Sequence, residues 1–154
     1  IQGEDLTDKI KLLKITLESL QIGCNFAAPG KRVGDIGYGV QNHAEKHGYG
    51  VVRELVGHGL GRNLHEKPEV PNYGKAGNGP ALKPGMTICI EPMINMGTKD
   101  VKTLADKWTI VTRDGKPSAH FEHVVAITDK GGEILSSFSK IETEIEKNEY
   151  LVKI

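Results

Sequence analysis

The chain has 154 residues, 38% of them hydrophobic and 26% charged, a composition typical of one globular domain with a buried core. Basic and acidic residues each total 20, so no net charge favours nucleic acid or an anionic membrane as a partner. No apolar run approaches the roughly 18 residues of a membrane span, and the first residues lack a signal-peptide pattern. We therefore expect a cytoplasmic protein without nucleic-acid or membrane partners.

The first half of the chain carries two helical patterns. Apolar residues recur every three or four positions in both: Leu6, Ile10, Leu13, Leu17 and Leu20, then Val33, Ile36, Val40 and Ala44. This spacing predicts two amphipathic helices. Gly23 is the expected stop of the first helix and Gly48 of the second. Because the chain starts with Ile1 rather than methionine and enters the first helix almost at once, we expect a processed or truncated piece of a longer protein.

Beyond Gly48 the sequence changes to short β-rich runs separated by turn-rich stretches. The runs cover residues 51–52, 86–90, 108–112, 123–128 and 133–135. Together with the two helices they predict an α+β fold, with helices packed on a curved and mostly antiparallel sheet. At the end, Ser139 and Glu142 form a capping-box pattern, which predicts a short helix in the tail at 139–154.

Two histidines stand in segments that suit a functional site. His58 lies among three glycines in Gly57-His58-Gly59-Leu60-Gly61, which removes side-chain bulk around the imidazole, although a tight turn with an incidental histidine is an equal reading. His65 is followed by Pro68, which excludes a zinc-binding H-E-x-x-H helix. A histidine on a loop suits a hydrogen-bond donor to a substrate.

Two glutamates occupy strand ends in apolar surroundings. Glu91 ends the run 87–91, where alternation places it with Thr87 and Cys89, and Glu122 shares a strand face with Val124. Two strand carboxylates and a glycine-flanked histidine are the ligands expected of a divalent-metal hydrolase. His58, Glu91 and Glu122 are therefore the predicted metal ligands.

The remaining histidines and both cysteines have a structural interpretation. The histidines are His43, His47, His120 and His123. Cys24 and Cys89 lie far apart and outside any C-x-x-C pair, which indicates buried, reduced thiols.

Several motifs together resemble methionine aminopeptidase of the compact bacterial type I. They are G-H-G-L-G-R-x-x-H-E-x-P-x-V-P-N at 57–72, K-P-G-M at 83–86, I-E-P-M at 90–93 and F-E-H at 121–123. The resemblance implies the pita-bread fold, with residues 1–138 as the C-terminal portion of the catalytic domain. It also implies removal of the N-terminal methionine from nascent proteins and peptides, by attack of a metal-activated water.

The resemblance also implies roles for individual residues. Two divalent ions, of cobalt, manganese, iron or zinc, would be bound in the complete enzyme, with His58 and Glu91 on one ion and Glu122 bridging both. Glu91 would shuttle a proton, His65 would bind the substrate and act in catalysis, and Trp108 and Leu64 would contact the substrate methionine. The two aspartate ligands of the family have no counterpart here, so we expect this chain alone to hold at most one ion weakly and to be nearly inactive. Because the family's strands before the first helix are also missing, we expect an exposed sheet edge and self-association.

Two other functions remain open from the sequence. Prolidase-like and aminopeptidase P-like enzymes share the fold and similar motifs, but the V-P-N-Y-G continuation after His65 favours methionine aminopeptidase. A metal-free binding module with the same fold is the second alternative. The presence of His58, His65, Glu91 and Glu122 together argues against it, since such a module has no chemical need for all four.

Overall fold

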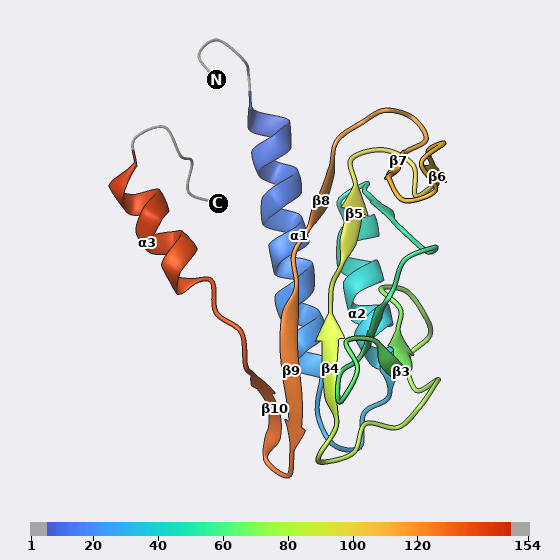
Figure 1. Cartoon of the computed structure of the whole chain (residues 1–154), viewed down its shortest axis with the longest axis vertical. Coiled ribbons are helices and arrows are strands. Elements are labelled where there is room, and N and C mark those ends of the chain that lie inside the picture. Colours follow the sequence, from blue (N-terminus) through green and yellow to red (C-terminus); the bar gives the residue numbers. More distant parts are fainter. Residues whose placement is uncertain (1–5, 149–154) are drawn as a thin grey trace.

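The computed structural model describes residues 6–148 and places three helices and ten strands in them. The helices are α1 (Thr7–Phe26), α2 (Val33–Lys46) and α3 (Ser139–Lys147). The strands are β1 (Gly50–Val51), β2 (Gly57–Gly59), β3 (Glu66–Val70), β4 (Thr87–Ile90), β5 (Met93–Asn95), β6 (Val101–Thr103), β7 (Ile110–Thr112), β8 (Ser118–His120), β9 (His123–Thr128) and β10 (Gly131–Ile134). Figure 1 shows α1 and α2 packed side by side behind the strands.

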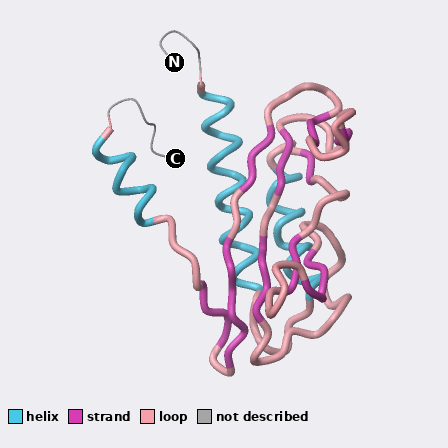
Figure 2. Tube along the Cα trace, viewed as in Figure 1, coloured by secondary structure: helices cyan, strands magenta, loops and turns pink. Residues whose placement is uncertain are grey.

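The strands form three antiparallel sheets. The largest has the order β10-β9-β4-β2-β3, a second has the order β1-β5-β8, and β6 pairs with β7. In Figure 2 the two larger sheets continue into each other along the chain, because β4 leads into β5 and β8 leads into β9. The predicted α+β class, with helices on an antiparallel sheet, is confirmed.

The core lies between the two long helices and these sheets. One cluster joins α1 and α2 to the largest sheet and includes Leu20, Ile36, Ile88 and Ile127. A second cluster joins the helices to the β1-β5-β8 sheet through Leu12, Val40 and Ile94. Burial of these side chains is the main favourable contribution to folding, at roughly 1.5 to 3 kcal/mol for each large one.

The predicted stop of the first helix is wrong, because α1 continues past Gly23 to Phe26. Gly23 is a packing position instead. A Cβ atom added there would lie 3.0 Å from a methyl group of Val40 and 3.1 Å from one of Ile90. Of the predicted apolar stripe, only Leu20 is buried, and the buried face is shifted toward Leu12 and Ile15. Small side chains, with Thr16 and Ser19 bonding back to helix carbonyls, let α1 approach its neighbours on that face.

The second predicted helix is confirmed over Val33–Lys46, with Gly48 in the left-handed region just after it. The C-terminal helix is also present as α3, but the predicted capping box is not, since Phe138 occupies the N-cap and makes no side-chain cap bond. None of the residues of α3 is buried, and it points away from the core in Figure 1. Residues 149–154 of the predicted tail lie outside the described part. Across residues 6–148, the helices are all too short or too polar to cross a bilayer.

Candidate metal centre

Strand register brings the two predicted carboxylates together. β4 and β9 run antiparallel with Cys89 opposite Val124 and Ile90 opposite His123. One further step along each chain places Glu91 opposite Glu122. β2 lies on the other side of β4, with Gly59 opposite Ile88, and so delivers His58 to the same end of the sheet. The three residues predicted as ligands therefore meet at one place.

The side chains at this place form two overlapping groups of ligand atoms. His58, Cys89 and Glu122 each offer an atom within 4.8 Å of the others, and so do Glu91, His120 and Glu122. Glu91 connects the groups, because its Oε1 lies 3.5 Å from Nε2 of His58 and its Oε2 lies 3.3 Å from Nε2 of His120. The donor set contains imidazole, carboxylate and thiol, which suits a divalent first-row cation.

The orientation of His58 leaves one ring nitrogen available for a cation. Its Nδ1 lies 2.9 Å from the carbonyl oxygen of Gly59. A carbonyl oxygen only accepts hydrogen bonds, so Nδ1 donates in this contact. This leaves Nε2, which lies 3.5 Å from Oε1 of Glu91, as the ring atom that could bind a cation.

The glycines around His58 let neighbouring backbones pack closely, in addition to removing side-chain bulk around the imidazole. Residues 57–59 form a strand, β2, and not a tight turn. A Cβ atom on Gly57 would lie 2.3 Å from the carbonyl oxygen of Cys89, and one on Gly59 would lie 2.3 Å from that of Lys67. The glycines therefore allow the neighbouring backbones to approach, which brings His58 close to the residues of β4.

A buried amide fixes the chain at Glu91. Asn72, which is fully buried, donates from Nδ2 to the backbone carbonyl of Glu91 at 3.0 Å. Pro92 follows directly, so β4 ends there. The Glu91 side chain is itself mostly buried, with 13% exposure, beside His58 with 14%. A carboxylate held in this way needs a positively charged or hydrogen-bonding partner.

His65 lies next to the cluster, and its role toward a substrate stays a prediction. Its ring centre is 4.3 Å from that of His58 in an edge-on contact. Both histidines line a cavity of about 630 Å³ together with Glu91, Met93 and His120. His65 precedes β3 in a bend, which agrees with the expected loop position.

The two predicted substrate contacts lie elsewhere on the surface. Trp108, between β6 and β7, is 87% exposed, and Leu64 is 69% exposed. Neither lines the cavity beside His58. Their proposed roles stay predictions.

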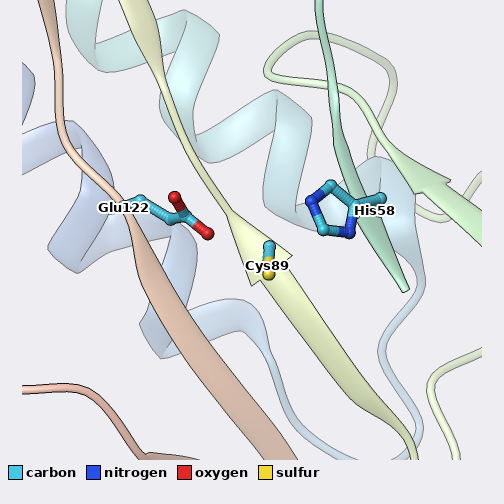
Figure 3. Close-up of side chains that lie close together, drawn as sticks. All are labelled: His58, Cys89 and Glu122. Carbon is cyan, nitrogen blue, oxygen red and sulfur yellow. The ribbon is translucent and has the colours of Figure 1, made fainter. Parts of the chain in front are cut away.

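Two residues of the cluster were missed in the sequence, although a signal was present. Cys89 and Glu91 are two residues apart on β4 and share a face, and the same spacing relates His120 to Glu122. Cys89 and His120 were instead interpreted as structural residues. Burial raises the pKa of the Cys89 thiol to about 12, assisted by its hydrogen bond to Glu122 and by the negative charges of Glu122 and Glu91. Figure 3 shows Cys89 between the side chains of Glu122 and His58.

The other histidines have the structural surroundings that were expected. Nε2 of His43 lies 2.8 Å from a carboxylate oxygen of Glu18, and His47 bonds back to the carbonyl of His43. His123 points away from Glu122, bonds Ser136 at 2.8 Å and stacks on Phe138. Burial lowers the pKa of His123, which favours its neutral form. None of these three belongs to the groups of ligand atoms.

Imidazole and carboxylate side chains gathered at the strand ends of an antiparallel α+β fold are the donors expected of a metal-dependent hydrolase. A comparison with family models makes the assignment specific. Residues 2–129 match the model of metallopeptidase family M24, and the chain belongs to this family.

Individual relatives agree with this assignment. The chain is 54% identical over 134 residues to methionine aminopeptidase 1 of Bacillus subtilis (strain 168), an alignment covering 87% of this chain and 54% of the relative. The crystal structure of methionine aminopeptidase from Rickettsia prowazekii superposes with a TM-score of 0.83 at 44% identity, covering 86% of this chain and 54% of that one. The prolidase from Pyrococcus horikoshii OT3 has a TM-score of 0.64 at 24% identity, covering 88% and 33%, which shows a shared fold.

These comparisons confirm the resemblance to methionine aminopeptidases and the pita-bread fold. The chain spans about half the length of the curated relatives it matches.

Proposed function

We propose that the protein containing this chain removes the N-terminal methionine from peptides and nascent proteins in the cytoplasm. The observation that carries the proposal is the convergence of His58, His65, Glu91 and Glu122 at one end of the sheet, beside an open cavity. The relatives named methionine aminopeptidase, at 44 to 54% identity, support this substrate class over the prolidases.

The residues of this chain divide the chemistry among them. A divalent cation bound by His58, Glu91 and Glu122 would supply Lewis-acid chemistry and lower the pKa of water at the site. The Glu91 carboxylate, in contact with both His58 and His120, is placed to accept the proton of the attacking water and pass it to the leaving amine. His65, one ring away from His58, is placed to donate a hydrogen bond to the substrate carbonyl and its developing negative charge.

For the 154-residue chain alone we propose weak binding of at most one ion and little turnover. The ligand groups among the described residues share Glu122, so a second ion would have no independent set of donors. Trp108 and Leu64 remain proposed contacts of the substrate methionine. Two ions would position the water and the substrate relative to each other, whereas a single ion would position them less well and so support less turnover.

The experiment is a chimera that adds to this chain the part of the Bacillus subtilis relative that it does not match. With Mn²⁺ or Co²⁺, the chimera is expected to release methionine from Met-Ala-Ser and to leave an X-Pro peptide intact. Glu91→Gln should reduce turnover roughly 10²- to 10⁴-fold, the range for loss of a general acid or base. Glu133→Gln, an exposed glutamate on β10, is the matched control and should have full activity.

Three results would contradict the proposal. Cleavage of the X-Pro peptide with no methionine release would assign the site to a prolidase-like enzyme. Undiminished turnover of Glu91→Gln would remove this residue from the chemistry. A chimera that folds and binds no metal would favour the metal-free binding module.

A further inference from the structure

Cys89 lies in the candidate metal centre, although the proposed mechanism assigns it no role. Its residue is 2% exposed, and it stands on β4 two positions before Glu91, on the same face of the strand. In Figure 3 its side chain lies between the carboxylate of Glu122 and the ring of His58. These three residues come from three different segments, which the sheet brings together. Glu122 lies in the loop that precedes β9, Cys89 lies in β4, and His58 lies in β2.

The distances fit a cation after small movements. The sulfur of Cys89, a ring nitrogen of His58 and a carboxylate oxygen of Glu122 all lie within 4.8 Å of one another. Around a tetrahedral zinc ion, with bonds of about 2.0 to 2.3 Å, neighbouring ligand atoms lie roughly 3.3 to 3.8 Å apart. Contraction by about 1 Å is within reach of side-chain rotation, because Glu122 is exposed.

The surroundings of Cys89 differ from those of Cys24, the other cysteine of the chain. Cys24 is also buried, but it belongs to the apolar cluster with Leu20, Ile36 and Ile90, where a thiol serves as a small hydrophobic side chain. Cys89 instead faces a nitrogen and an oxygen donor. The same sheet end therefore presents a soft ligand beside two harder ones.

We propose that Cys89 is a metal ligand of this site and that, with His58 and Glu122, it gives the protein a preference for a thiophilic divalent cation such as Zn²⁺, Co²⁺ or Cd²⁺. On binding, the sulfur forms a bond to the cation and its proton passes to solvent. Thiolate ligands select such ions over Mn²⁺ and Mg²⁺, which prefer oxygen. The inference rests on the metal site of the proposed function, and the experiment distinguishes the two.

The experiment is a titration with Co²⁺, followed by the near-ultraviolet charge-transfer absorption of a cobalt–thiolate bond. The chain contains two cysteines, so Cys24→Ala leaves Cys89 as the only thiol. We expect the absorption in the wild type and in Cys24→Ala, and its loss in Cys89→Ser. X-ray absorption of the zinc-loaded wild type should show a sulfur neighbour at about 2.3 Å, a result that needs no variant.

Affinity provides the second measurement. Cys89→Ser should weaken Zn²⁺ binding at least about 10-fold, because even the loss of a residue that only hydrogen-bonds to a metal ligand weakens binding by about that much. The same variant should weaken Mn²⁺ binding less. Binding of Co²⁺ and Zn²⁺ by the wild type without sulfur absorption or a zinc–sulfur distance would overturn the role of Cys89 and leave the metal site standing. Failure of the wild type to bind any of these ions would overturn both.

Discussion

Gly57→Ala tests whether the approach of two backbones builds the site. The new Cβ would lie 2.3 Å from the carbonyl oxygen of Cys89 and 3.1 Å from that of Val70. Ordinary contact begins at 3.4 Å, so β2 and β4 would have to separate by about 1 Å. Overpacking of this kind costs roughly 1 to 3 kcal/mol, and we expect the upper end because backbone atoms cannot rotate away as side chains do. The same displacement moves His58 from Glu91 and should weaken metal binding.

Urea unfolding of the wild type and two variants measures this cost. Gly30→Ala is the control, because an added Cβ there has no atom within 4 Å and meets only the strain of a φ of 82°. That strain corresponds to roughly 1 to 2 kcal/mol. We expect a larger loss of unfolding free energy for Gly57→Ala than for Gly30→Ala, together with weaker Mn²⁺ binding. An equal or smaller loss than in Gly30→Ala, with unchanged Mn²⁺ affinity, would refute this expectation.

Three further predictions follow from burial and exposure. Burial raises the pKa of Cys24 to about 11, so the folded chain holds this proton more tightly than the unfolded chain. The contribution of this thiol to stability should be full below pH 9 and decline as the pH rises from about 9 to 11, and the decline should be smaller in Cys24→Ala. Ile36→Ala should cost about 2 to 5 kcal/mol in urea unfolding, whereas Ile141→Ala on exposed α3 should cost less than about 0.5, and equal costs would contradict the assigned core. The 154-residue chain should self-associate in sedimentation experiments through exposed apolar groups such as Leu135, and a strictly monomeric chain would oppose this prediction.

Regular alternation and helical spacing were the parts of the fold that the sequence predicted well. The range 123–128 was predicted as a strand and is β9, because His123, Val125 and Ile127 alternate with less buried neighbours. The second helix and its end near Gly48 were also predicted correctly. These elements carry their own pattern, and tertiary contacts reinforce it.

Elements whose conformation depends on neighbouring strands were not predictable in the same way. Gly57, His58 and Gly59 have little intrinsic preference for a strand, and β2 forms because β3 and β4 supply its partners. Gly23 is a reasonable helix stop by local rules, yet the approach of α2 makes it an interior residue of α1. Contacts between distant segments decided both positions.

The sequence pointed to three residues of the candidate metal centre and did not point to two others. His58, Glu91 and Glu122 were identified as a ligand set, and the structure brings them to one end of the sheet. Cys89 and His120 were not, because the pairing of β4 with β9 and of β5 with β8 is needed to see that they face the same space. Their spacing of two residues from Glu91 and Glu122 was the available signal.

Calorimetric titration of the 154-residue chain with Mn²⁺ measures whether His58, Glu91 and Glu122 bind a divalent cation. We expect weak binding of one ion per chain, lost in Glu91→Gln and Glu122→Gln and retained in the control Glu133→Gln. Binding of equal strength in all four proteins, or no binding in any of them, would contradict the claim.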